Sequence, residues 1–134
     1  MALANISKQP VKDDRESRIH LSAMVIKLFD HWKLSVSDAS DLLGLASVGR
    51  TTISRYRKGE PLATNRDLQE RVGHLLAIHQ SLRILFPRNR EMVYGWPTAP
   101  NKAFGGISPI QYMKEQGFIG VAEVRRYLDF QRGQ

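Results

Sequence analysis

The apolar residues of the chain recur at intervals of three and four positions, which predicts helices rather than strands. The first stripe follows residue 18 and consists of Leu21, Met24, Val25, Leu28, Phe29 and Trp32. A second stripe, between Asn65 and Phe86, predicts the longest helix, and Pro87 ends it. No stretch of four or more residues alternates between apolar and polar positions, as a half-buried strand would. We therefore expect an all-α fold.

Helix-capping residues delimit two short helices between these stripes. Ser37, with Asp38 in the following turn, predicts the start of the first helix, and Gly44 predicts its end. After a short connection, the second helix is expected from Arg50 to Lys58, and Gly59 ends it. Two helices joined in this way are typical of a helix-turn-helix.

The last third of the chain contains shorter elements and stiff turns. We expect a short helix from Arg88 to Tyr94, an ordered turn from Gly95 to Asn101, a helix from Ser108 to Gly117 and a final helix from Val121 to Phe130. Aromatic residues are interleaved with the glycines and prolines of these turns. A small helical cap on the long helix explains part of this pattern, and a defined surface that docks a protein explains the rest.

The net charge of the chain indicates what kind of partner it binds. The 134 residues include 20 Lys and Arg against 13 Asp and Glu, and this net charge of +7 favours a polyanion such as nucleic acid. The absence of cysteine excludes a disulfide framework, a thiolate metal site and a cysteine nucleophile. No apolar stretch is long enough to span a bilayer, and the first residues lack the apolar core of a signal peptide. We therefore expect a cytoplasmic protein with no membrane contact.

Basic residues are concentrated in the second helix of the helix-turn-helix. Ala39 or Ser40 supplies the small residue that the first helix needs, Gly44 turns the chain, and Ile53 anchors the second helix in the core. The other positions of the second helix face outward and are candidates for DNA contacts: Arg50, Thr51, Thr52, Ser54, Arg55, Arg57 and Lys58. Arginine reads guanine edges with two parallel hydrogen bonds, and lysine binds phosphates. A solvated basic helix face without a target is the alternative.

Two sets of motifs resemble known families. Leu42-Leu-Gly-Leu45, followed by Thr52-Ile-Ser-Arg-Tyr-Arg-Lys-Gly-Glu60, resembles the helix-turn-helix of Xre-type regulators. The segments Trp96-Pro-Thr-Ala-Pro-Asn101, Phe104-Gly-Gly-Ile-Ser-Pro-Ile110 and Val124-Arg-Arg-Tyr-Leu128 resemble the toxin-binding domain of Xre/MbcA/ParS antitoxins. The resemblance covers residues 34–130, although the connection before Ile53 is longer than in the tightest Xre-type members.

The resemblance implies an antitoxin of a type II toxin–antitoxin pair, which forms a homodimer, binds operator DNA and represses its own operon. The usual partner in this family is a RES-domain toxin, which depletes cellular NAD. The implied toxin contacts lie at the turn between residues 101 and 109 and on the final helix: Asn101, Phe104, Glu123, Arg125, Arg126, Tyr127, Asp129 and Phe130. A carboxylate of Glu123, Asp129 or the chain terminus is a candidate plug for the cationic cavity of such a toxin.

The expected domain organisation follows from the helices and the resemblance together. We expect residues 1–18 to form a mobile N-terminal arm or a loosely attached first turn, residues 19–64 to form the helix-turn-helix domain, and residues 65–134 to form a helical toxin-binding and dimerisation domain.

Nothing in the chain indicates catalysis. The candidates for proton transfer or metal binding are His20, His31, His74 and His79, but the last two lie off a common helix face and have no carboxylate nearby. Gly105-Gly106 lacks the strand and the lysine of a phosphate loop. We therefore expect no enzyme, no metal and no cofactor. An orphan Xre-like transcriptional regulator without a toxin, and an interaction module that has lost its DNA, remain as alternatives.

Overall fold

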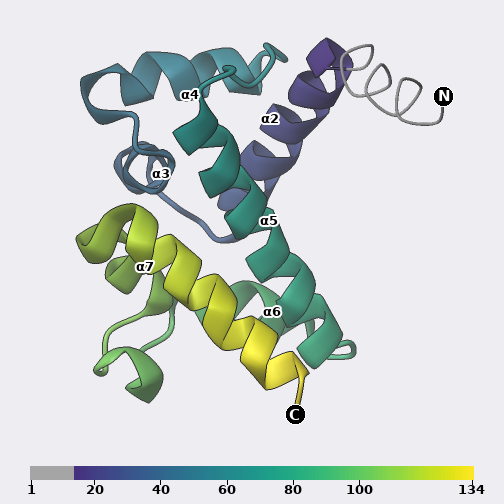
Figure 1. The fold of residues 1–134 in the computed structure, drawn as a ribbon, viewed down its shortest axis with the longest axis vertical. Coiled ribbons are helices and arrows are strands. Elements are labelled where there is room, and N and C mark those ends of the chain that lie inside the picture. Colours follow the sequence, from purple (N-terminus) through teal and green to yellow (C-terminus); the bar gives the residue numbers. More distant parts are fainter. Residues whose placement is uncertain (1–13) are drawn as a thin grey trace, which may run out of the picture.

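A computed structural model describes residues 14–134 of the chain, and within this range the regular elements are all helices (Figure 1). The expected all-α fold is confirmed. The elements in chain order are α2 (Asp14–His31), α3 (Val36–Leu43), η1 (Ala46–Val48), α4 (Gly49–Arg57), α5 (Arg66–Leu85), α6 (Arg90–Gly95), η2 (Trp96–Thr98), η3 (Lys102–Phe104) and α7 (Pro109–Arg132).

The first helix of the helix-turn-helix is α3, and it begins two residues earlier than expected. Its N-cap is Ser35, whose side chain accepts a hydrogen bond of 3.0 Å from the backbone N–H of Asp38. The expected N-cap, Ser37, lies inside the helix, in its first turn. Gly44 ends α3 in the left-handed conformation, with φ of 66°, as its sequence position predicts.

Helix α5 is the central element of the molecule (Figure 1). It contacts α2 and α3 as well as α6 and α7, so both halves of the chain share it. Its buried face consists of Leu68, Val72, Leu75, Ile78, Ser81 and Leu82. The apolar residues of this face belong to a core that also includes Trp32, directly after α2, Leu42 of α3 and Val124 of α7. The two halves are therefore packed around one continuous core.

An aromatic stack joins the end of α2 to α5 and α6. The ring of Tyr94 lies 4.4 Å from the ring of His31 and 5.4 Å from the ring of His79, and both pairs are stacked. The guanidinium of Arg90 lies over the Tyr94 ring at 4.8 Å. This stack connects the helix-turn-helix to the second half of the chain.

Helix α7 contains a break at a single residue. Ser108 caps its start and Pro109 occupies the first helical position, as expected. Gly117 has φ of 68° and ψ of −145°, a conformation that favours glycine, and the helix resumes directly after it. The expected start of a new helix at Val121 is therefore three residues too late, and α7 continues to Arg132 rather than ending at Phe130.

Part of the expected N-terminal arm is helical. Residues 14–18 form the first turn of α2, which is one of the two arrangements expected for this segment. The guanidinium of Arg18 donates hydrogen bonds of 2.8 Å to the Asp14 carboxylate and of 2.8 Å to the Leu62 carbonyl. These bonds attach the start of α2 to the segment before α5. Residues 1–13 lie outside the described part of the chain.

Candidate functional site

Helix α4 is held against the core along one face. Gly49, Ile53 and Tyr56 are its buried residues, and they follow one another at helical spacing. Ile53 is the expected anchor, whereas Tyr56 was not anticipated, because its neighbours in the sequence are basic. The Tyr56 hydroxyl accepts a hydrogen bond of 3.3 Å from the backbone N–H of Ala63, which ties α4 to the segment that leads into α5.

Gly49 allows α3 and α4 to approach each other closely. A Cβ atom at Gly49 would lie 1.8 Å from Ser40 Oγ and 2.4 Å from Ser40 Cβ, so no larger residue fits without moving a helix. Ser40 itself is buried, in agreement with the expectation that a small residue of α3 faces α4. This contact fixes how far α4 projects from the body of the molecule.

The outer face of α4 carries the candidate DNA-binding residues. Six of the seven are exposed: Arg50, Thr51, Ser54, Arg55, Arg57 and Lys58. Thr52 is half-buried, and it lines a hollow of about 320 Å³ together with Arg55. At 100° per residue, Thr51, Ser54, Arg55 and Lys58 point directly away from the buried face, while Arg50 and Arg57 share one flank. Their contact with DNA stays a prediction.

Arg57 differs from the other cations of α4, because an acid of a different helix holds it. Its two terminal nitrogens, Nη1 and Nη2, donate hydrogen bonds of 2.8 Å and 3.0 Å to the two oxygens of Asp30, at the end of α2. The hydrogen bond from Arg57 holds the pKa of the Asp30 carboxyl below its ordinary value. Sequence spacing did not indicate this pair, because the two residues lie 27 positions apart.

The second candidate region is an aromatic hollow of about 420 Å³ between η3 and α7. Phe104 is buried at its base, with its ring 5.0 Å from that of Tyr112 and 5.3 Å from that of Tyr127. The ring of Trp96 packs behind them, 6.3 Å from both Phe104 and Tyr127. The aromatic residues that alternate with turns in the sequence therefore meet in one cluster.

The structure brings together five of the eight candidate toxin-binding residues. Phe104, Glu123, Arg126, Tyr127 and Phe130 line the aromatic hollow, together with Ala103 and Tyr112. Phe130 lies at the exposed end of this set, with 64% of its surface accessible. A large aromatic side chain with this exposure, next to a hollow, is typical of an interface anchor.

The other three candidates lie elsewhere. Arg125 and Asp129 form an ion pair of 3.4 Å on the side of α7 that faces α5, where Arg125 Nη1 lies 3.2 Å from His74 Nδ1. Asn101 organises the turn: its side chain accepts a hydrogen bond of 2.9 Å from the Ala103 N–H, and its carbonyl accepts bonds from Phe104 and Gly106. These positions give Asn101 a structural role and separate Arg125 from the hollow.

Tyr112 is a member of the hollow that sequence reasoning missed. Its hydroxyl donates a hydrogen bond of 2.9 Å to the Glu123 carboxylate, and this bond raises the pKa of Tyr112 above its ordinary value. Glu123 is therefore engaged within the hollow and is a poor candidate for a projecting plug. The spacing of eleven residues across the Gly117 break concealed this pair in the sequence.

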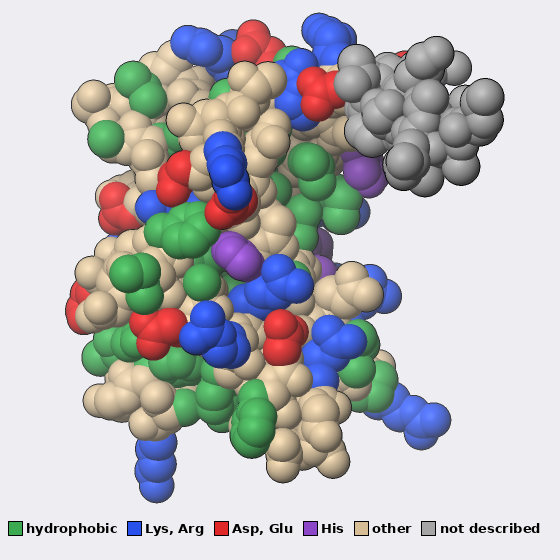
Figure 2. All heavy atoms as spheres, viewed as in Figure 1, with side chains coloured by type: hydrophobic (Ala, Val, Ile, Leu, Met, Phe, Trp, Pro, Cys, Tyr) green, Lys and Arg blue, Asp and Glu red, His purple; other side chains and the backbone are tan. Residues whose placement is uncertain are grey.

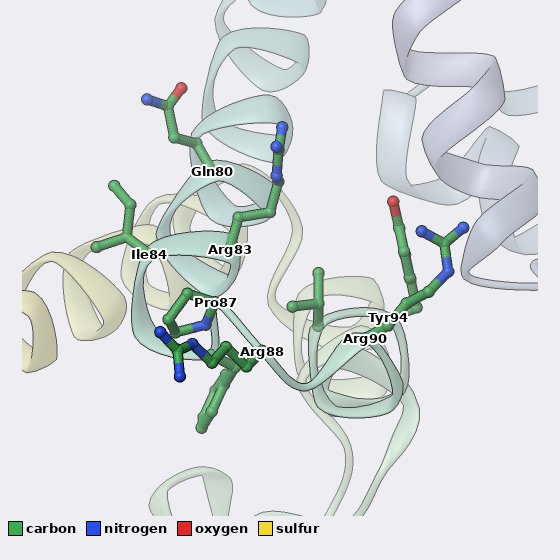
Figure 3. A pocket seen from close by; sticks show the side chains of 9 residues that line it. Gln80, Arg83, Ile84, Pro87, Arg88, Arg90 and Tyr94 are labelled. Atoms are coloured by element: carbon green, nitrogen blue, oxygen red, sulfur yellow. The ribbon is translucent and has the colours of Figure 1, made fainter.

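The largest cavity described lies at a different place, in the corner between α5 and α6 (Figure 3). It measures about 760 Å³ and is lined by Gln80, Arg83, Ile84, Phe86, Pro87, Arg88, Arg90, Val93 and Tyr94. The side chains of Arg83, Arg88 and Arg90 point in different directions in this view, so they do not converge on one ligand (Figure 3). The cavity is therefore a surface hollow without an organised set of donors.

The surface shows no single charged face on the side drawn in Figure 2, where basic and acidic side chains are intermixed and basic ones project from both ends. Among residues 14–134, no three His, Asp or Glu side chains gather as a metal site would require. No helix in the same range is both long and apolar enough to cross a membrane.

The exposed basic α4, which packs against α2 and α3, and the separate aromatic hollow define a helix-turn-helix protein with two candidate binding surfaces. A model of the Antitoxin Xre-like helix-turn-helix domain matches residues 21–77. A model of the Antitoxin Xre/MbcA/ParS C-terminal toxin-binding domain matches residues 81–133. The chain therefore belongs to the Xre/MbcA/ParS family of antitoxins, as its motifs predicted.

One relative has a similar sequence along most of its length. Uncharacterized protein y4oB of Sinorhizobium fredii is 37% identical to this chain over 125 residues, which cover 92% of each protein.

Proposed function

We propose that this antitoxin has two separable activities: α4 binds operator DNA and represses the antitoxin's own operon, and the aromatic hollow binds a RES-domain toxin that depletes NAD. The observation that carries the proposal is the placement of two different candidate surfaces on one core. One is the exposed basic face of α4, and the other is the hollow between η3 and α7 with Phe130 at its edge.

The DNA-binding half of the proposal is supported by the composition of the exposed face of α4. Arg50, Arg55 and Lys58 project from it, and the ion pairs of residues 14–134 leave all three without an acidic partner. In helix-turn-helix proteins the start of the recognition helix reads base edges. Arg50 and Thr51 are accordingly assigned to bases, and Arg57 and Lys58, near the end of α4, to phosphates.

The first test measures binding to a labelled duplex that carries the promoter region upstream of the antitoxin's coding sequence. Replacing Arg50, Arg55 and Arg57 together by alanine should abolish specific binding, since each base-reading arginine contributes about 1–3 kcal/mol. Removal of a phosphate-binding arginine within this set should also flatten the salt dependence. Unchanged affinity of the triple variant would sink the assignment of α4 to DNA.

The toxin-binding half is supported by the exposure of Phe130 and by the family's toxin-binding domain, which includes the hollow. The second test co-expresses the antitoxin with the product of the adjacent gene, which we propose to be the RES-domain toxin, and measures growth and cellular NAD. Phe130→Glu should weaken protection, because a charge replaces an aromatic anchor. Ile84→Glu is the matched control, since Ile84 is also an exposed apolar side chain but lies at the other hollow.

If the Phe130→Glu variant protects the cell fully, the toxin contact lies at the turn between residues 101 and 109 rather than at Phe130. The absence of any toxin that the wild-type antitoxin neutralises, with promoter binding intact, would favour an orphan transcriptional regulator instead.

We further propose that the antitoxin is a homodimer in the cytoplasm, because one recognition helix reads only a few base pairs and a dimer reads a palindrome.

A further inference from the structure

The ion pair between Arg57 and Asp30 occupies a cation of the proposed DNA-binding face. Both terminal nitrogens of Arg57 are engaged, at 2.8 Å and 3.0 Å, by the two carboxylate oxygens of Asp30. The side chains remain 53% and 54% exposed, so the pair lies at the surface rather than in the core. DNA that approaches this flank of α4 therefore meets a neutral pair where the sequence suggests a free arginine.

A carboxylate and a phosphate present arginine with similar targets, because each offers two oxygens to the parallel N–H groups of the guanidinium. Asp30 therefore occupies the hydrogen-bond donors that Arg57 would use to hold a DNA phosphate. An exposed pair of this kind is weak, so a phosphate held in the right position displaces the carboxylate easily.

We propose that Asp30 is a specificity-determining residue that competes with DNA phosphates for Arg57 and so suppresses binding to non-specific DNA. This inference rests on the proposed binding of operator DNA by α4 and adds a mode of regulation to that site. Non-specific affinity comes almost entirely from cations that neutralise phosphates, so it falls when one cation is already paired. At the operator, base contacts fix the position of the duplex and so place a phosphate against Arg57. The bond to this phosphate compensates for the loss of the bond to Asp30.

The test compares two labelled duplexes of equal length, the promoter duplex and a scrambled version, across a series of salt concentrations. In Asp30→Asn, affinity for the scrambled duplex should rise several-fold, and its salt dependence should steepen by about 0.9 in log–log slope for the freed cation. Affinity for the promoter duplex should rise less, so the ratio between the two affinities should fall. Asp30→Ala should behave in the same way, which separates loss of the carboxylate from any effect of the new amide.

Two further variants separate competition for Arg57 from simple repulsion by a negative charge. Glu91→Gln removes one acid from α6, which lies at the other end of the molecule from α4 (Figure 1), and should change neither affinity. In the background of Arg57→Gln, the Asp30→Asn change should have no further effect, because the competed cation is absent. An equal gain in both backgrounds would show repulsion and overturn the inference.

The outcomes distinguish this inference from the proposed function. If the wild-type protein binds the promoter duplex and Asp30→Asn has the same two affinities, the competition is refuted and operator binding stands. A loss of affinity in Asp30→Asn would also refute it, because Asp30 would then position Arg57 for DNA. If the wild-type protein binds neither duplex, both proposals fail together. Circular dichroism of each variant confirms that the helical fold is retained.

Discussion

Gly49 shows how a single residue sets the geometry of the helix-turn-helix. Any side chain at this position would collide with Ser40, so the backbone of α4 at Gly49 packs directly against the small Ser40 side chain of α3. Gly73 provides a contrast, because it also lies within a helix, but a Cβ atom there would have no neighbour within 4 Å.

We expect Gly49→Ala to destabilise the protein by about 1–3 kcal/mol, since overpacking forces the two helices apart. Gly73→Ala should instead stabilise it by about 0.5–1 kcal/mol, because alanine is the better helix former at an exposed site. Urea unfolding followed by circular dichroism measures both changes. Equal midpoints for Gly49→Ala and the wild type would contradict the close approach of α3 and α4.

Some residues of the sites were predictable from the sequence and others were not, for a physical reason. Ile53 and Gly44 are recognised by local spacing, because a helix anchor and a helix end depend on near neighbours. Asp30, Tyr112 and Arg71 act through partners that lie far away in the sequence. Arg71, for example, donates to the Leu42 carbonyl and lies over the Phe118 ring, and it so connects α3, α5 and α7.

Among the elements, α2, α5 and α6 meet at the stack of His31, Tyr94 and His79. Burial lowers the pKa of His79 from its ordinary value of 6.5, and the charges of Arg83 and His31 lower it further. Burial also lowers the pKa of His74, with a further contribution from Arg125. Both histidines are therefore neutral in the folded protein at neutral pH.

This neutrality predicts a loss of stability in mild acid. The unfolded chain takes up protons near pH 6.5, whereas the folded chain does so only at the lowered pKa values of the two histidines. The free energy of unfolding should therefore be constant above about pH 6.5 and decrease below it. The Asp30 carboxyl, with a pKa below its ordinary 3.8, contributes only at lower pH.

His79→Phe is the informative variant for this window, because it keeps a ring in the stack and removes the titration. Thermal unfolding between pH 7 and pH 5 should show a shallower decline for the variant than for the wild type. Parallel declines for the two proteins would exclude His79 as a source of the pH dependence.

The helices themselves were predictable because their signals are local. Caps, glycine stops and the apolar stripe located α3, α4, α5 and the start of α7 to within a few residues. The predicted helix boundaries were wrong where two local signals compete, or where packing against the core decides whether a helix continues. Ser35 and Ser37 both match an N-cap, and only the helix actually formed selects Ser35. The break at Gly117 lasts one residue, because the helix on each side is held by the core.

At the scale of the whole molecule, several large apolar side chains remain exposed within residues 14–134: Met24, Val36, Val48, Ile84, Met92, Ile119 and Phe130. Ile119, on α7, is 68% exposed, and it does not line the aromatic hollow. Exposed apolar groups of this kind are typical of a surface that another protein covers.

We expect light scattering to show a homodimer whose interface lies outside residues 37–58, which leaves both recognition helices free. Ile119→Glu should shift the population towards monomer, because the charge opposes burial in an interface. A monomer at micromolar concentration, both with and without DNA, would count against the dimer.

The sharing of α5 between both halves restricts how such antitoxins exchange parts during evolution. The two family models meet within this helix, between residues 77 and 81, and its buried face packs against α2 and α3 as well as α7. A new DNA specificity cannot be gained by grafting a foreign helix-turn-helix at a loop, because the graft would lack its share of the core. A viable chimera has to join its parents inside α5, in helical register and with matching apolar positions. The other route to a new DNA specificity is to substitute only the exposed residues of α4. Diversification of operators within this family should therefore proceed mainly by point substitution on one short helix, while the body that recognises the toxin is inherited intact.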